Sequence, residues 1–246
     1  EIPSSDHIIK HAYGKTMDWA IESSIETTLA AKEAGLYTVF FTIDSTRSDL
    51  DRYMDLIERV STEGHMDALT VADSFGVCTP EGIAMVLKKL RARFSQPIEI
   101  HCHEDFGLGV ANTIAALANG ASVAHVTVSA TGERAGNVPL EDTVMALKIL
   151  YGIDVGIRTE ELYGLSKLVQ KLAGLELPPN RPIVGDSLYH IESGIVSMFH
   201  RRCKDVEPLE YIPFLPEVVG RPGVDIALGK GSGLANIEEH LERLGI

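Results

Sequence analysis

The sequence predicts an α/β protein whose parallel strands form part of a (β/α)8 TIM barrel. Short runs of β-branched and aromatic residues alternate with longer segments of helical periodicity over the first 155 residues. Alternation of this kind favours a parallel sheet with helices outside it. Polar, potentially reactive side chains follow each predicted strand, as in barrels whose active sites lie at the carboxyl ends of the strands. The alternative is a doubly wound sheet, which usually has a Gly-rich first turn that this sequence lacks.

Individual elements follow from local patterns. Residues 1–14 have the turn chemistry of a strand end that continues into a loop. Apolar residues near a 3.6-residue period predict a helix over 18–34, which Gly35 ends. Thr79 and Pro80 are typical of an N-cap and of the first position of a helix. The other predicted strands are 37–43, 68–72, 98–103 and 123–128, and the other predicted helices are 48–64, 79–94, 108–120 and 140–151.

The pattern changes after residue 155. Residues 159–173 predict one amphipathic helix, residues 178–182 predict a stiff linker, and the rest of the chain is rich in loops and short helices. We therefore expect two parts. Residues 1–155 belong to the barrel, and residues 156–246 form a mostly helical post-barrel extension.

Composition restricts the classes of partner. The chain has 246 residues with 22 Lys and Arg against 35 Asp and Glu, which gives a formal net charge of −13. This charge argues against a nucleic-acid surface and against binding to anionic membranes. No apolar run approaches the length that a membrane span requires. The three cysteines show no paired spacing, so a reducing, cytoplasmic compartment is the simplest expectation.

Two histidines at the end of one predicted strand form the most distinctive local pattern. Ile98 and Ile100 alternate with Glu99, and His101 and His103 continue this spacing of two. Side chains two apart on a strand face the same side. Neutral imidazoles are good ligands for Mn, Zn, Co and Fe, so the pair predicts a divalent-metal site. The alternative is two polar histidines that bind no metal.

Five motifs occur in an order that points to a known family. They are HCHEDFGLGVAN (101–112), GERAGN (132–137), PPNRPIVG (178–185), ESGI (192–195) and LGKGSG (228–233). With these motifs the chain resembles the 2-isopropylmalate and homocitrate synthases and, more broadly, the metal-dependent (β/α)8 superfamily that includes hydroxymethylglutaryl-CoA (HMG-CoA) lyase. The resemblance implies that the chain covers the C-terminal part of the barrel, about strands 4 to 8. It also implies an arginine–aspartate pair on a first strand that this sequence does not contain.

The resemblance implies a metal site and a substrate site. His101 and His103 match two metal ligands of the family, and Asn137 matches a third, weaker one. The alternative for Asn137 is a turn residue that tolerates left-handed geometry. Ser74 lies where the family places a hydroxyl against the carboxylate of a 2-oxo acid, and Thr127 offers another hydroxyl near the end of its strand. Their alternatives are a capping residue and a β-branched strand residue.

Asp44 is the candidate catalytic acid. The run Phe41-Thr42-Ile43-Asp44 resembles a Phe-Ser-x-Glu pattern of the family, with the shorter acid in the last place. A carboxyl group there is expected to polarise or deprotonate a group near the metal. The alternatives are a helix N-cap and an ion-pair partner for Arg47.

Three departures from the family alter its equipment for proton transfer. ESGI continues with Val196-Ser197-Met198 rather than with His-Gln-Asp. Gly231 replaces the histidine of LGKHSG, and Ser129-Ala130 replaces the usual Asn-Gly before GERAGN. The metal-binding motif, in contrast, is retained.

The resemblance implies a transferase of amino-acid biosynthesis, an acyltransferase that converts the acyl group into an alkyl group on transfer. Acetyl-CoA or another acyl-CoA condenses with a 2-oxo acid in a Claisen-type reaction, with Mn, Zn, Mg or Co as the cofactor. A homodimer is expected. Two alternatives remain open. One is a metal-dependent lyase or aldolase that cleaves a carbon–carbon bond of a 2-hydroxy or 2-oxo acid, and the other is a non-catalytic paralogue that binds a metabolite.

Overall fold

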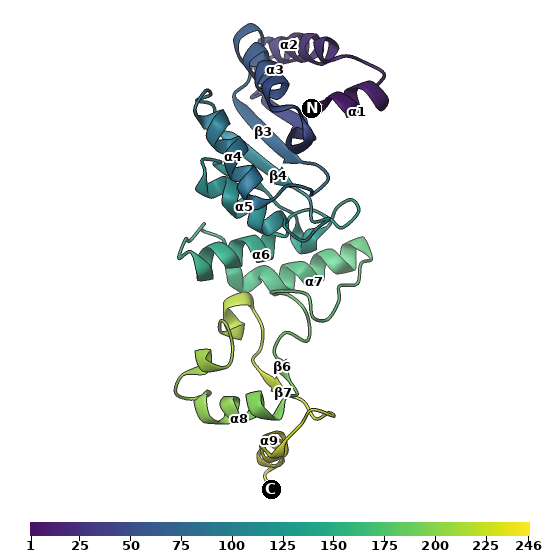
Figure 1. Ribbon diagram of the computed structural model, residues 1–246. Coiled ribbons are helices and arrows are strands. Elements are labelled where there is room, and N and C mark those ends of the chain that lie inside the picture. The colour runs from purple at the N-terminus through teal and green to yellow at the C-terminus, as the bar shows by residue number, and fades with distance from the viewer. The chain divides into compact units, whose positions relative to one another are not determined.

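A five-stranded parallel sheet forms the centre of residues 1–143 in the computed structural model, which describes every residue from 1 to 246 (Figure 1). Its strands are β1 (Ile2–Pro3), β2 (Val39–Ile43), β3 (Ala68–Asp73), β4 (Ile98–Cys102) and β5 (Val123–His125). The strands lie side by side in the order in which they occur in the chain, and every neighbouring pair is parallel. A doubly wound sheet would reverse its strand order at one point. The predicted parallel α/β class is therefore confirmed, and the doubly wound alternative is not supported.

The observed helices agree with most of the predicted helices and differ from them mainly at their ends. They are α1 (Asp6–His11), α2 (Met17–Glu33), α3 (Leu50–Glu63), α4 (Pro80–Arg91), α5 (Gly109–Ala118) and α6 (Leu140–Met145). Thr79 caps α4 as predicted, because its side-chain oxygen accepts a hydrogen bond from Gly82 N at 3.3 Å. Pro80 follows it at the start of the helix, where a missing N–H group costs nothing.

Two elements differ from the prediction. The loop expected after the first strand contains α1, a helix of 6 residues. Ile9 of this helix is buried, so packing rather than local periodicity stabilises it. The strand expected over 123–128 ends at His125, and Val128–Ala130 form a 3-10 turn instead. Ser129 has a left-handed backbone (φ 60°), which is incompatible with a strand.

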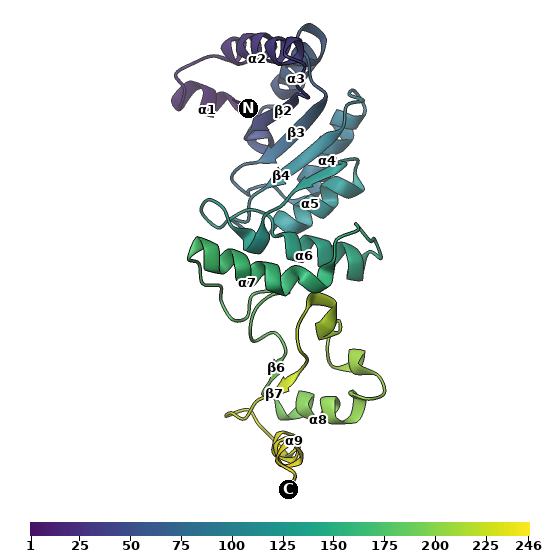
Figure 2. The same ribbon diagram turned by 180° about the vertical axis from the view of Figure 1, so that it is seen from behind.

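The apolar core lies between one face of the sheet and helices α3, α4 and α5. Val71 and Ile100 point to this face and are fully buried. They belong to one cluster with Ile57 of α3, Leu87 of α4 and Ala116 of α5. Figures 1 and 2 view the sheet from opposite sides, and in both views α4 and α5 lie on the same face. Alternate positions on these strands face away from the helices, and Glu99, His101 and His125 occupy such positions.

Residues 144–246 form a second unit made of short elements. The predicted helix over 159–173 is confirmed as a 3-10 turn, Thr159–Glu161, followed by α7 (Leu162–Ala173). The other elements are a π-helical turn (Ala146–Leu150), β6 (His190–Ile191), α8 (Gly194–Cys203), 3-10 turns at Pro208–Glu210 and Pro216–Val219, β7 (Asp225–Ile226) and α9 (Leu234–Leu244). β6 and β7 pair in parallel. No helix of the chain combines the length and the apolar character needed to cross a membrane. The boundary predicted after residue 155 and the post-barrel assignment stay predictions.

Candidate active site

Four loops follow β2, β3, β4 and β5 at the carboxyl edge of the sheet. Because these strands are parallel neighbours, their carboxyl ends all lie at this edge. The six residues predicted from the sequence all lie in these loops or at the strand ends that precede them, namely Asp44, Ser74, His101, His103, Thr127 and Asn137. The contacts they make differ, and so does the chemistry that each contact allows.

The three predicted metal ligands lie together. His101 Nε2 and His103 Nε2 are 3.4 Å apart, and Asn137 Nδ2 is 3.1 Å from His101 Nε2. An isolated antiparallel bridge joins His103 to Asn137, so the loop after β5 folds back onto the end of β4. A turn of the Asn137 amide would exchange its nitrogen and oxygen and present an oxygen donor at the same point. Two imidazole nitrogens and one amide can therefore approach one ion.

The electrostatics of His101 suit a cation rather than a proton. The pKa of His101 is lowered to about 4, first by burial and then by the neighbouring imidazoles of His103 and His125. The His101 imidazole is therefore neutral near pH 7, which is the form that binds a metal. Nδ1 of His103 is buried and has no hydrogen-bond partner.

The donor set fits a divalent cation but is incomplete. No group of three or more His, Cys, Asp or Glu side chains is placed to hold a metal ion. Two imidazole nitrogens and an amide leave further positions for oxygen ligands, as expected when a substrate chelates the metal. Gly132 makes the approach of Asn137 possible, because a Cβ atom at residue 132 would lie 1.9 Å from Asn137 Oδ1. The GERAGN segment thus needs glycine at this position to bring its asparagine to the histidines.

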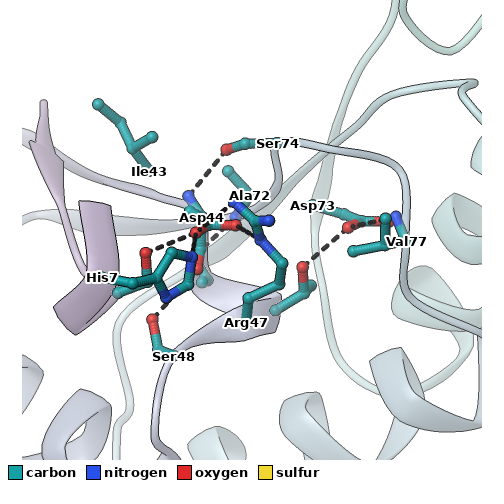
Figure 3. Close-up of polar contacts among 12 residues, drawn as sticks. His7, Ile43, Asp44, Arg47, Ser48, Ala72, Asp73, Ser74 and Val77 are labelled. Carbon is teal, nitrogen blue, oxygen red and sulfur yellow. Dashed lines mark hydrogen bonds and ion pairs between the residues drawn. The ribbon is translucent and has the colours of Figure 1, made fainter. Parts of the chain in front are cut away.

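Asp44 is fully buried and its carboxylate is surrounded by donors (Figure 3). Nε and Nη2 of Arg47 donate to its two oxygens at 2.7 Å and 3.0 Å. Ser5 Oγ donates to Oδ2 at 2.5 Å, and His7 Nε2 lies 3.2 Å from the same atom. The Asp44 backbone N–H donates to Ser74 Oγ at 2.8 Å. Of the two alternatives for Asp44, the ion pair with Arg47 is observed. The N-cap is not, because the Asp44 side chain accepts no hydrogen bond from the backbone of the turn that follows it.

The loop after β3 is held by a different buried aspartate. Asp73 accepts hydrogen bonds from Thr46 Oγ1 at 2.8 Å and from Val77 N at 3.1 Å (Figure 3). It also accepts one from Cys78 N at 3.2 Å. These contacts fix the loop that carries Ser74. The Ser74 hydroxyl oxygen accepts from Asp44 N, and its own proton remains available for a further contact.

Thr127 lies just beyond the end of β5. Its backbone N–H donates to Val138 O at 2.8 Å, and it forms an isolated parallel bridge with Pro139. Its hydroxyl oxygen Oγ1 is buried and has no hydrogen-bond partner. A buried hydroxyl without a partner is costly, and a ligand in the site would relieve that cost.

A carboxylate–imidazole pair that the sequence did not predict lies on the same face of the sheet. His125 is the direct neighbour of His101 across the β4–β5 pair, and its Nε2 lies 2.8 Å from Glu99 Oε2. The ring centroids of His125 and His101 are 5.5 Å apart, and the ring of Phe41 lies 5.3 Å from His101. The spacing of two between Glu99 and His101 indicates that these two side chains share a face. The position of His125 beside them depends on the register of β5 with β4.

Comparison with known families shows to which family the chain belongs. A family model described as HMGL-like matches residues 1–169 of the chain. The chain belongs to the HMGL-like family. Solved structures of HMG-CoA lyases share the HMGL-like TIM-barrel fold with its parallel strands. The lyase of Bacillus subtilis matches this chain with a TM-score of 0.64 and 23% sequence identity. The match covers 72% of this chain and 63% of the lyase. At this level of identity the likeness concerns the fold alone.

Curated relatives of this HMGL-like chain carry the names of synthases. A putative (R)-citramalate synthase of Archaeoglobus fulgidus is 45% identical over 99% of this chain and 49% of the relative. A homocitrate synthase of Methanothermobacter thermautotrophicus is 38% identical over 99% of this chain and 61% of the relative. A probable 2-isopropylmalate synthase of Methanopyrus kandleri is 40% identical over 100% of this chain and 48% of the relative. The HMGL-like chain therefore spans about half to three-fifths of the length of these relatives.

Proposed function

We propose that this chain supplies part of the active site of a divalent-metal-dependent acyltransferase, which condenses an acyl-CoA with a 2-oxo acid. One observation carries the proposal: His101, His103 and Asn137 come together at the carboxyl edge of a parallel sheet. The names of the relatives, citramalate, homocitrate and 2-isopropylmalate synthase, support the reaction class. Acetyl-CoA is the proposed acyl donor.

The two imidazoles and the Asn137 amide are the proposed ligands of Mn, Zn, Mg or Co. When bound, such a cation polarises the ketone of the 2-oxo acid and stabilises the charge that develops on its oxygen. The Thr127 hydroxyl, which is buried without a partner, is proposed to donate a hydrogen bond to the substrate carboxylate. The Ser74 hydroxyl has a proton available for the same carboxylate, because its oxygen accepts rather than donates in the contact with Asp44 N.

Asp44 is the proposed acid–base residue. Its backbone N–H is hydrogen-bonded to Ser74, so Asp44 lies beside the proposed carboxylate-binding hydroxyl. The ion pair with Arg47 supports the alternative role, in which Asp44 fixes Arg47 and the turn after β2. The two roles predict different kinetics, which are considered in the Discussion.

The comparisons do not favour the other functional classes. The lyase structures resemble this chain at 23% identity or less, which supports a common fold and not a common reaction. The departures at Val196 and Gly231 motivate a non-catalytic paralogue, but the imidazole pair and the unpartnered Thr127 hydroxyl support a working site. The particular 2-oxo acid, the choice of metal, a homodimer and a cytoplasmic location belong to the same proposal.

The test is a thiol-release assay with the purified protein, acetyl-CoA and the three 2-oxo acids whose acetyl condensation yields citramalate, homocitrate and 2-isopropylmalate. We expect release of free CoA that requires both a 2-oxo acid and a divalent cation, together with the corresponding 2-hydroxy acid in the mass spectrum. Chelator-treated protein is the control. Thiol release that does not depend on any 2-oxo acid would rule out the condensation, while cation binding measured separately would still report on the metal site.

A further inference from the structure

Arg134 connects three loops at the carboxyl edge of the sheet. Its Nε donates to Asp105 Oδ1 and its Nη2 donates to Asp105 Oδ2, both at 2.8 Å. Nη2 also donates to the backbone carbonyl oxygen of Ser74 at 2.7 Å. The guanidinium carbon lies 5.3 Å from the centroid of the Phe75 ring. One side chain thus joins the loop after β5 to the loops after β3 and β4.

Both ends of this contact lie next to candidate metal ligands. Asp105 follows His103 by two residues, and Arg134 precedes Asn137 by three. Backbone hydrogen bonds run beside the ion pair, because Glu104 N donates to the carbonyl oxygen of residue 136 at 3.0 Å. The two segments that carry the ligands therefore meet where the Arg134 guanidinium binds.

The backbone of Arg134 is left-handed, with φ 57°. This conformation is unfavourable for a residue with a Cβ atom, so the segment needs outside contacts to maintain it. The Arg134 side chain is 38% exposed, and an ion pair at that exposure adds little to the stability of a whole domain. Its planar, two-pronged geometry fixes direction instead. The left-handed backbone and the two-pronged contact with Asp105 therefore suit Arg134 to orienting the loop after β5.

The same aromatic ring extends the connection to a fourth loop. The guanidinium carbon of Arg47, which follows β2, lies 3.9 Å from the centroid of Phe75. Asp44, Arg47, Phe75, Arg134 and Asp105 thus form a continuous series of contacts across all four loops. Movement of the GERAGN segment is therefore opposed by the loops after β2, β3 and β4 together.

We propose that Arg134 is a positioning residue, which holds residues 132–137 against the neighbouring loops so that the Asn137 amide stays within ligand distance of His101 and His103. The inference rests on the proposed function, because it concerns the cation that this site would bind. Arg134 touches neither the cation nor the substrate in this assignment. It acts through the direction of the Asn137 side chain.

The experiment compares metal affinity with stability in the purified protein. The variants are Arg134→Gln, Arg134→Lys and Asp105→Asn. The matched control is Arg59→Gln, which breaks a similar two-pronged pair with Glu63 on α3, far along the sequence from the site (2.7 Å and 3.0 Å). Mn²⁺ affinity is measured by equilibrium dialysis, and the melting temperature is measured on metal-free protein. The d–d absorption of bound Co²⁺ reports the coordination geometry.

We expect Arg134→Gln to weaken Mn²⁺ binding by about tenfold or more, as for loss of a residue that orients a ligand, and to melt like Arg59→Gln. Arg134→Lys should also weaken binding, because lysine keeps the charge but cannot form the fork. Asp105→Asn should have the same effect. The double variant Arg134→Gln/Asp105→Asn should bind no more weakly than Arg134→Gln alone, because Arg134→Gln already removes the ion pair with Asp105.

Two results would overturn the inference while leaving the proposed function intact. One is wild-type Mn²⁺ affinity in all three variants. The other is a loss of melting temperature in Arg134→Lys and Asp105→Asn that is larger than in Arg59→Gln and accounts for the loss of affinity, which would mark a purely structural contact. Wild-type protein that binds neither Mn²⁺, Co²⁺ nor Zn²⁺ would overturn both the inference and the proposed function.

Discussion

Asp44 and Arg47 form a two-pronged ion pair in which the carboxylate is fully buried and the guanidinium is not. The side chains are 0% and 35% exposed, and the two hydrogen bonds are 2.7 Å and 3.0 Å long. A buried carboxylate is costly unless donors satisfy it. Arg47 is therefore one of the groups that allow an acid to lie beneath the loop after β2.

Replacing Arg47 with glutamine should destabilise the protein. Ser5 and His7 would remain on the buried carboxylate, so we expect a partial loss of about 1–3 kcal/mol in the free energy of unfolding. Denaturant titration measures this change. Arg59→Gln, on an exposed pair, should show no measurable loss. Equal stability of the two variants would show that the ion pair of Asp44 with Arg47 does not contribute to the free energy of unfolding.

The kinetic role of Asp44 separates acid–base chemistry from positioning. If Asp44 moves a proton, Asp44→Asn should lower kcat by about 10²–10⁴-fold, because general acid–base groups contribute on that scale. Arg47→Lys keeps the carboxylate and should lower kcat far less. The thiol-release assay gives both values. Similar losses in the two variants would favour the positioning role and count against proton transfer by Asp44.

The imidazole pair can be tested without turnover. His101→Gln and His103→Gln each remove one nitrogen of a pair only 3.4 Å apart, so we expect Mn²⁺ affinity to fall on the order of 100-fold or more. Dialysis against a chelator and re-addition of metal should abolish and restore thiol release in the wild type. His65→Gln is the control, since His65 pairs with Asp67 away from the site. Unchanged metal content in both site variants would refute the assigned ligands.

The turn after β5 contains strain that a single substitution should relieve. Ala130 has φ 57°, a left-handed conformation that is unfavourable for a residue with a Cβ atom. Glycine adopts that conformation freely, so Ala130→Gly should raise the free energy of unfolding by about 1 kcal/mol. Ala34 has an ordinary φ of −75°, so Ala34→Gly should not raise the free energy of unfolding. Destabilisation by Ala130→Gly would show that the methyl group contributes more than the strain costs.

His200 should make stability sensitive to pH. Burial lowers its pKa, Lys204 and Arg243 act in the same direction, and Glu239 and Asp205 oppose them. Nδ1 of His200 is buried without a partner. Because the folded pKa lies below the unfolded one, the unfolded state takes up a proton first, and stability is lost as pH falls below about 6.5.

A phenylalanine at position 200 removes this proton uptake. Between about pH 7.5 and 5.5, His200→Phe should lose less stability than the wild type, by at most about 1.4 kcal/mol per pH unit for one group. Denaturant unfolding at the two pH values measures the difference. Identical pH dependence in His200→Phe and the wild type would contradict the assignment.

The residues that could be predicted are those whose neighbours are close in sequence. His101 and His103 share a face because a strand has a period of two, and Arg47 reaches Asp44 from three residues away. Thr79 caps α4 through a contact with Gly82. Periodicity and local spacing are sufficient for such cases.

The remaining features depend on contacts that spacing does not define. His125 meets Glu99 and His101 only through the register of β4 with β5, and α1 is held by the burial of Ile9. The ion pair of Arg134 with Asp105 joins two loops that are 29 residues apart. Motif matching placed Asn137 with the histidines, but the glycine at 132 that makes the approach possible became evident only from the structure.

The strand order of the sheet has a consequence for how the chain acquires its structure. Each strand pairs with the one synthesised next to it, so that Thr70 reaches Glu99 across 29 residues and Ser122 reaches Ile98 across 24. No strand must wait for a partner from the far end of the sheet, and each loop closed during growth is short. Successive strand–helix units can therefore add to one growing edge while the polypeptide emerges from the ribosome. The GERAGN loop, which follows β5, would then fold back onto the loop after β4, which is made before it.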